Sequence, residues 1–125
     1  MPETPHRPIL VVDDDDDLRE TLGELLAEEG YDARCFENGR VALEFLRAQR
    51  GDGIPMLVLL DLMMPEMNGW QFREEQLRDA ALARIPVVVM TASRSLAEHP
   101  VDADEILYKP VGLDQLLSVV ARNAR

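Results

Sequence analysis

The sequence predicts an α/β domain in which five parallel strands alternate with helices that cover both faces of the sheet. Short apolar runs alternate along the chain with segments whose hydrophobic residues recur at helical spacing. Three of the apolar runs are continuous, as expected for strands buried on both faces. The length of 125 residues is that of one domain. We therefore expect a single domain over 1–125, with its core at about 8–123 and a flexible start at 1–7.

The first half of the chain predicts two strands, each followed by a helix. The apolar run at 8–12 is the first strand, and 18–29 places four leucines on one helical face before Gly30 ends that helix. The alternating segment 31–36 predicts a second strand. The segment 40–50 predicts a second helix, which ends at the sequence Gly-Asp-Gly.

The second half predicts three further strands and two helices. The expected strands are 56–60, 85–90 and 105–108. The expected helices are 70–82 and a C-terminal helix that includes 113–120. Strands flanked by helical segments in this way imply parallel βαβ units with right-handed crossovers. The expected sheet is therefore doubly wound.

Composition and charge exclude several classes of function. The chain has 13 basic and 24 acidic residues and a net charge of −11. Such a charge disfavours contact with nucleic acid and anionic membranes, and it suits metal cations and basic partner surfaces. No apolar run approaches the roughly 20 residues of a membrane span, and the start MPETPHRP is not a signal peptide. We expect a cytoplasmic protein in which the single cysteine, Cys35, is a small buried residue.

Charged or hydroxyl side chains follow four of the five predicted strands. In chain order they are Asp13 with Asp14, Asp61, Thr91 and Lys109. Parallel strands bring their carboxyl ends to one edge of the sheet, where ligands bind. Three carboxylates there would repel one another unless a hard cation such as Mg²⁺ offset the repulsion. An aspartate can itself accept a phosphoryl group, and a lysine and a hydroxyl can bind its oxygens.

The first two aspartates belong to a run of five, at 13–17. The remaining three, Asp15, Asp16 and Asp17, fall where the following helix begins. Acidic groups at an N-cap and in a first turn favour the helix dipole. We therefore expect Asp13 and Asp14 to bind a cation and Asp15 to Asp17 to stabilise the start of the helix.

Four motifs in this order resemble the receiver domain of bacterial two-component response regulators, of the stand-alone type found in chemotaxis. They are VVDD at 11–14, LLDLMMPEMNG at 59–69, VMTAS at 89–93 and LYKP at 107–110. Each motif is weak alone, and their order and spacing over residues 8–123 make the resemblance strong. It implies a flavodoxin-like fold with the strand order 2-1-3-4-5.

The resemblance also implies a phosphorylation site. Asp61 would be the phosphoacceptor, and Asp13 and Asp14 would hold Mg²⁺ together with Asp61 and the backbone carbonyl of Met63. The donor would be a histidine kinase, a phosphotransfer protein or a small acyl phosphate.

Further roles are implied for residues that surround the acceptor. Thr91 would hydrogen-bond the phosphoryl group and Lys109 would pair with it. The peptide bond between Lys109 and Pro110 would be cis. Pro65 and Gly69 would shape the loop that follows the acceptor.

The resemblance implies a switch that catalyses only its own phosphorylation and dephosphorylation. It would be a monomer or weak dimer and would signal through protein–protein contacts to a target that the sequence does not identify. We expect no direct regulation of genes by this chain alone, because it has no DNA-binding segment and is strongly acidic.

The sequence departs from the family pattern in two places. The residue three before the lysine is Ile106, where the family has an aromatic residue that swings inward as the threonine moves. The segment between Thr91 and Lys109 is shorter than usual and contains Pro100, so a fourth helix at 94–103 is expected to be short, distorted or missing.

The residues two after Asp61 and Thr91 suggest a long-lived phosphoryl group. In the family these positions flank the water that hydrolyses the phosphoryl group. Here they are Met63 and Ser93, neither of which is an obvious base or amide to orient that water.

Three other functions fit parts of the pattern. A haloacid-dehalogenase-type phosphatase would need Thr or Val at the position of Asp17. A calcium-binding EF-hand beginning at Asp13 would need glycine at the position of Leu18. A receiver fold that serves as a binding module without phosphorylation is the third, and Ile106 is the feature that favours it.

Overall fold

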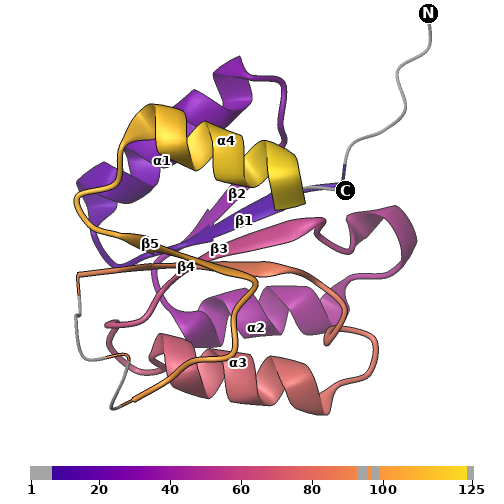
Figure 1. Ribbon diagram of the computed structural model, residues 1–125. Helices are drawn as coiled ribbons and strands as arrows, with labels where there is room; N and C mark the ends of the chain where they lie inside the picture. The colour runs from indigo at the N-terminus through magenta and orange to yellow at the C-terminus, as the bar shows by residue number, and fades with distance from the viewer. Residues whose placement is uncertain (1–6, 93–95, 97–98, 124–125) are drawn as a thin grey trace, which may run out of the picture.

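Five parallel strands form one sheet in the order β2-β1-β3-β4-β5 (Figure 1). This is a computed structural model, and it describes residues 7–92, 96 and 99–123. The strands are β1 (Ile9–Val12), β2 (Ala33–Phe36), β3 (Leu57–Asp61), β4 (Val87–Thr91) and β5 (Glu105–Tyr108). The predicted fold class and strand order are confirmed.

Two helices cover each face of the sheet. The helices are α1 (Asp16–Glu28), α2 (Gly39–Ala48), α3 (Gly69–Arg78) and α4 (Leu113–Asn123), and a 3₁₀ turn, η1 (Gly51–Gly53), precedes β3. Figure 1 shows α1 and α4 on one side and α2 and α3 on the other. Within the described residues, every helix is too short or too polar to span a lipid bilayer.

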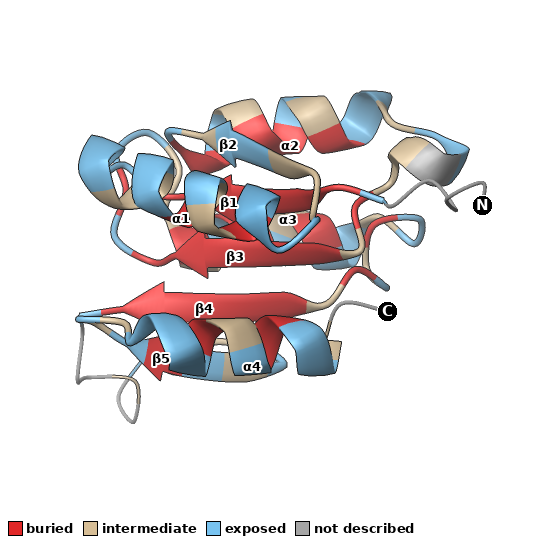
Figure 2. Ribbon diagram, turned by 90° about the horizontal axis from the view of Figure 1, so that it is seen from above, coloured by how far each residue is buried: buried red, intermediate tan, exposed pale blue. Residues whose placement is uncertain are grey.

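The three central strands, β1, β3 and β4, are buried along their whole length, as Figure 2 shows. Alternate residues of β1 enter two separate cores, because successive side chains of a strand point to opposite faces. Leu10 and Val12 pack with α2 and α3, whereas Ile9 and Val11 pack with α1 and α4. Each fully buried aliphatic side chain contributes about 2 kcal/mol. These two cores hold the carboxyl ends of the strands in fixed positions.

The aspartate run begins α1 as predicted. Asp15 is the N-cap, and its carboxylate accepts a hydrogen bond of 3.1 Å from the backbone N–H of Leu18. Asp16 and Asp17 lie in the first turn, where their charge favours the helix dipole. Thus the last three aspartates stabilise a helix start, and the first two are left for the edge of the sheet.

The prediction that Cys35 is buried is wrong. Cys35 lies on the edge strand β2 and is exposed. Its side chain faces Gly23 of α1, where an added Cβ would come within 3.0 Å of the sulfur. Because Gly23 has no side chain, the thiol can approach α1 closely, and it donates a hydrogen bond of 3.8 Å to the backbone carbonyl of Arg19.

Helix α3 ends four residues earlier than the predicted 70–82. It begins with a capping box in which Asn68 and Gln71 bond to each other's backbone N–H groups. At the other end the Asp79 carboxylate accepts a hydrogen bond of 2.9 Å from the N–H of Ala81. This local bond competes with the helical pattern and begins a turn instead.

An extended segment, 99–104, lies between β4 and β5 and packs on α3; we call it the strap. Among the described residues between Thr91 and Glu105, none lies in a helix. The predicted short or irregular fourth helix is confirmed to that extent, and the part of the prediction that falls on 93–95 and 97–98 lies outside the described residues. The label α4 therefore belongs to the C-terminal helix.

Candidate functional site

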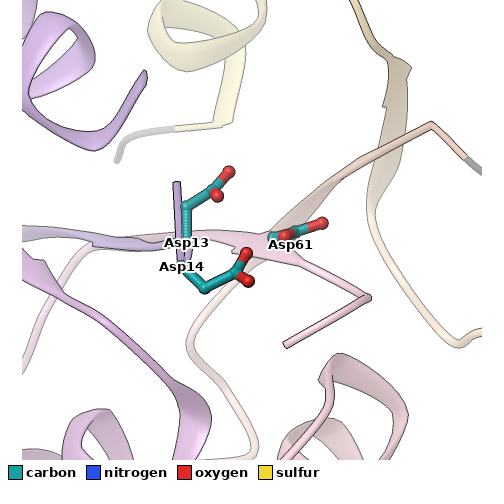
Figure 3. A group of neighbouring side chains, drawn as sticks. All are labelled: Asp13, Asp14 and Asp61. Atoms are coloured by element: carbon teal, nitrogen blue, oxygen red, sulfur yellow. The ribbon is translucent and has the colours of Figure 1, made fainter. Parts of the chain in front are cut away.

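Three carboxylates meet at the carboxyl ends of the neighbouring strands β1 and β3. Asp13 follows β1 directly, Asp14 comes next, and Asp61 ends β3. One oxygen of each carboxylate lies within 4.8 Å of the others (Figure 3). Asp13 is 0% and Asp61 4% exposed, whereas Asp14 is exposed. The sheet thus holds two buried carboxylates and one exposed carboxylate together.

Lys109 brings a positive charge to this group from the end of β5. Its Nζ lies 2.9 Å from Oδ2 of Asp13 and 3.6 Å from Oδ2 of Asp61. Its backbone N–H donates a hydrogen bond of 2.8 Å to the carbonyl of Thr91. The Lys109–Pro110 peptide bond is cis. The lysine is therefore fixed both through its backbone and through its ammonium group.

Thr91 ends β4 and is 0% exposed. Strand β4 lies between β3 and β5, with Asp61 paired to Met90 and Thr91 paired to Tyr108. The strand order therefore brings the predicted acceptor, hydroxyl and lysine to three adjacent strand ends.

The surroundings of Asp61 favour its protonated form when no cation is bound. Burial, followed by the negative charge of Asp13, raises the pKa of Asp61 to about 7, against the opposing effects of Lys109 and the Met63 N–H. Burial lowers the pKa of Lys109, but its hydrogen bond to Asp13 and the charge of that carboxylate outweigh burial and raise the pKa above its ordinary value. A cation bound beside Asp61 would favour its ionised form.

This pKa shift predicts that folding stability depends on pH in the absence of Mg²⁺. The folded protein holds a proton on Asp61 up to about pH 7, whereas an unfolded aspartate loses it near pH 4. Stability therefore falls as the pH rises between about 4 and 7. Relative to Asp61→Asn, the wild type should lose about 2 kcal/mol between pH 5 and pH 8. Urea unfolding of both proteins in a chelator measures this, and parallel pH profiles would contradict it.

The loop after Asp61 requires a glycine. A Cβ on Gly69 would lie 2.7 Å from the carbonyl oxygen of Asp61 and 2.8 Å from the Cα of Leu62. Both contacts involve the backbone at the site, so any side chain at position 69 would displace the acceptor. Pro65 is exposed in the same loop, and its carbonyl accepts the N–H of Met67 at 2.7 Å.

Glu66 ties this loop to the start of α2, a link that the sequence did not reveal. Glu66 has a φ of 64°, a left-handed conformation that few residues other than glycine adopt. Its carboxylate accepts hydrogen bonds of 3.0 Å from Asn38 and 3.3 Å from Arg40. Asn38, which is buried, also caps α2. The side-chain bonds offset the cost of the unusual backbone.

Arg19 is another residue near the site that sequence reasoning missed. Its guanidinium donates a hydrogen bond of 2.7 Å from α1 to the backbone carbonyl of Asp13. Spacing along the helix could have suggested that Arg19 faces the strand end, but no motif marks it.

The remaining predicted site residues lie at the margin of the site or outside the described residues. Met63 is exposed, and its N–H lies 3.4 Å from Oδ1 of Asp61. Ile106 is 37% exposed on β5. Ser93 lies outside the described residues, so its role stays a prediction.

The donor atoms fit a hard divalent cation. All three side chains offer carboxylate oxygens, the ligand type that Mg²⁺ prefers. Asp13 already accepts hydrogen bonds of 2.9 Å from the N–H of Asp15 and from Lys109. Each of its oxygens has a second lone pair that can face a cation. Asp13, Asp14 and Asp61 are therefore the residues that would hold Mg²⁺.

Residues 9–121 match the family profile of the response regulator receiver domain. The chain belongs to this family. A signal receiver domain of a histidine kinase from Syntrophus aciditrophicus superposes with a TM-score of 0.84 at 31% identity, covering 94% of this chain and 89% of that one. Thermotoga maritima TrrA, solved in complex with Mg²⁺ and BeF, superposes with a TM-score of 0.80 at 31% identity, covering 93% and 97%.

Full-length relatives of this receiver domain are longer proteins. Response regulator MprA of Mycolicibacterium vanbaalenii is 38% identical over 114 residues, which are 88% of this chain and 47% of MprA. Regulatory protein AtoC of Escherichia coli is 36% identical over 119 residues, which are 91% of this chain and 24% of AtoC. The chain thus spans about half of the first relative and a quarter of the second, and the similarity extends over the receiver domain alone.

Proposed function

We propose that this receiver domain accepts a phosphoryl group on Asp61 in a Mg²⁺-dependent reaction and signals through changed protein–protein contacts. One observation carries the proposal. Asp13, Asp14 and Asp61 lie within 4.8 Å of one another, with the Lys109 ammonium 2.9 Å from Asp13 and 3.6 Å from Asp61. A nucleophile, a set of cation ligands and a positive charge for phosphoryl oxygens are therefore in one place.

In the proposed reaction, a carboxylate oxygen of Asp61 attacks the phosphorus of a phosphohistidine. An O–P bond forms, the N–P bond breaks, and the electron pair of that bond returns to the imidazole of the donor. A bound Mg²⁺ supplies charge neutralisation for the phosphoryl oxygens. Lys109 pairs with one of these oxygens, and the hydroxyl of Thr91 hydrogen-bonds another. Asp13, Asp14 and Asp61 would hold the cation, and the backbone carbonyl of Met63 is proposed as a further ligand.

The proposed donor is a histidine kinase or a phosphotransfer protein, since receiver domains take phosphoryl groups from such proteins. A small acyl phosphate is a second proposed donor. We further propose a cytoplasmic location and a monomer or weak dimer, without direct binding to nucleic acid or membranes. The strongly acidic surface, with a net charge of −11, supports the absence of those two partners.

Beryllofluoride, a phosphoryl mimic, tests the site without a donor protein. We expect BeF₃⁻ and Mg²⁺ together to raise the melting temperature, because a ligand that binds only the folded state stabilises it. Neither ligand alone should produce the full effect. Asp61→Asn should abolish the combined effect, and stabilisation by BeF₃⁻ without Mg²⁺, or in Asp61→Asn, would contradict the proposal.

The strap is the proposed route by which phosphorylation changes the surface. It leads directly into β5, the strand that precedes Lys109, and it lies in the part of the chain between Thr91 and Lys109, the two proposed phosphoryl-binding residues. Its described contacts with α3 include a hydrogen bond of 3.1 Å from the Trp70 indole N–H to the carbonyl of His99. Trp70 is the only tryptophan of the chain, so its fluorescence reports on this contact.

We expect the complex with Mg²⁺ and BeF₃⁻ to shift the emission of Trp70 to the red, because movement of the strap would expose the indole to water. Asp61→Asn should show no shift. An unchanged spectrum in a protein that binds BeF₃⁻ would place the output elsewhere while leaving the phosphorylation site intact.

A binding module that works without phosphorylation is the second candidate function. The residue that favours it is Ile106, which stands where the family has its aromatic switch residue. Because Ile106 is 37% exposed on β5, it can contact a partner with no inward swing. The BeF₃⁻ experiment separates the two functions, since a module without phosphorylation has no need to bind the mimic.

A further inference from the structure

Two arginines lie where the strands begin, at the end of the sheet opposite the phosphoacceptor, and neither pairs with an acidic side chain among the described residues. Most described basic side chains pair with a carboxylate. Among the described residues, Arg7, Arg50 and Arg84 have no carboxylate at ion-pair distance. Arg50 donates instead to the carbonyls of Arg47 and Gln49. In a chain of net charge −11, two arginines without such partners are unusual.

Arg7 and Arg84 lie at the same end of the sheet. Arg7 precedes β1 and Arg84 precedes β4, and β3 alone separates these two strands. All the strands are parallel, so both residues lie where the strands begin, on the right in Figure 2. Asp61 ends β3 at the opposite edge. The two arginines therefore form a feature separate from the phosphorylation site.

Both arginines line one hollow of about 360 Å³. This volume is at the lower end of the range for small-molecule sites. Its wall is otherwise apolar, with contributions from Ile54, Pro55 and Ile85, of which Pro55 and Ile85 are buried. Among the described residues that line the hollow, none is acidic. The hollow thus combines a hydrophobic wall with two positive charges that pair with no carboxylate in the part of the chain that the structure describes.

We propose that this hollow binds a small organic anion that has a carboxylate or phosphate group on an apolar body. A guanidinium offers a planar set of N–H donors that matches both groups and holds them in two-point contact. The apolar body packs against the wall and loses its contact with water. The apolar contact is essential, because the negative charge of the whole chain disfavours an anion held by charge alone. Two sources supply this chemistry: a free organic anion and the carboxyl terminus of a peptide.

Titration of the ¹⁵N-labelled chain tests the hollow. The probes are hexyl phosphate and hexanoate, with hexanol and inorganic phosphate as controls, in Mg²⁺-free buffer so that phosphate is not drawn to the aspartates. We expect both anionic probes to shift the backbone N–H signals of Ile54, Met56, Ala81 and Ile85. Hexanol, which lacks the charge, and inorganic phosphate, which lacks the apolar body, should each bind more weakly than hexyl phosphate.

The variants Arg7→Gln and Arg84→Gln should each weaken binding by about tenfold or more. Arg47→Gln is the matched control, because Arg47 is an exposed arginine that pairs with Glu75 of α3 and does not line the hollow. The affinity of this variant should equal that of the wild type. Equal affinity in all variants, or shifts confined to other parts of the chain, would overturn the proposal.

A second arm identifies the source of the anion. A short peptide that ends in leucine is titrated with a free and with an amidated carboxyl terminus. Tighter binding of the free-terminus peptide than of hexanoate supports a peptide terminus as the ligand. Tighter binding of hexanoate supports a free organic anion. If the amidated peptide bound as tightly as the peptide with a free carboxyl terminus, the proposal that the arginines recognise a negative charge would be wrong.

Discussion

Replacing Asp13 with asparagine should slow phosphorylation of Asp61 by about 100-fold and weaken Mg²⁺ binding. Asp13 is fully buried, and its two oxygens accept hydrogen bonds of 2.9 Å from the N–H of Asp15 and from Lys109. An asparagine amide keeps the shape and one acceptor oxygen, so the fold should persist. The substitution removes one charged ligand of the cation. It also removes the charge closest to Lys109, so that the lysine can pair with Asp61 instead. The rate with acetyl phosphate and a Mg²⁺ titration measure the two effects.

Asp17→Asn is the matched control for Asp13→Asn. Both residues belong to the same run of five aspartates, and both substitutions remove one charge. Asp17 lies in the first turn of α1, not among the three clustered carboxylates. Its replacement should change the phosphorylation rate by no more than a few-fold. If Asp13→Asn and Asp17→Asn behaved alike, general negative charge would matter and the assigned cation site would be wrong.

Replacing Arg73 with methionine should destabilise the folded protein by about 2 kcal/mol. Arg73 is 7% exposed on α3, and its Nε donates a hydrogen bond of 2.7 Å to the carbonyl of Asp102 in the strap. A second nitrogen donates to the side-chain oxygen of Gln76 at 3.0 Å. Methionine fills much of the volume but donates to neither oxygen, so the buried side-chain oxygen of Gln76 and the partly buried carbonyl of Asp102 lose this donor. Urea unfolding measures the loss.

The Asp102 carboxylate contributes little to this effect, because it lies 3.8 Å from Arg73 and its side chain is 72% exposed. Arg78→Met is the control, since Arg78 on the same helix is exposed and pairs only with exposed or half-buried glutamates. It should cost less than about 0.5 kcal/mol. Equal stability of the two variants would mean that Arg73 does not hold the strap on α3.

The parallel strands and the candidate site could be predicted from local sequence patterns, whereas the strand order was implied by the resemblance to the receiver family. Continuous apolar runs mark buried strands, and the residue after each run must lie at the carboxyl edge of a parallel sheet. This is why Asp13, Asp61, Thr91 and Lys109, far apart in the chain, were expected together. The run of five aspartates could be divided into two cation ligands and three residues that begin a helix, because the leucine spacing indicates where that helix begins.

Features that depend on tertiary contacts were not predictable. Gln76 is buried, and its amide donates hydrogen bonds of 2.9 Å and 3.0 Å to the carbonyls of Leu82 and Ile85. These bonds hold the turn after α3 that the helical pattern of 70–82 obscured. Cys35 is exposed on the outermost strand, β2, where its sulfur lies close to Gly23 of α1. Such facts require knowledge of which residue faces which across the fold.

The most direct measurement of the central claim is the intact mass of the chain after incubation with acetyl phosphate, with and without Mg²⁺. We expect a gain equal to one phosphoryl group that requires Mg²⁺ and is absent in Asp61→Asn, because we propose Asp61 as the nucleophile and the three clustered carboxylates as the ligands of the cation. The same gain in Asp61→Asn would show that another residue is modified. No gain in the wild type, with acetyl phosphate or with a panel of histidine kinases, would contradict the phosphoacceptor function and favour the binding module.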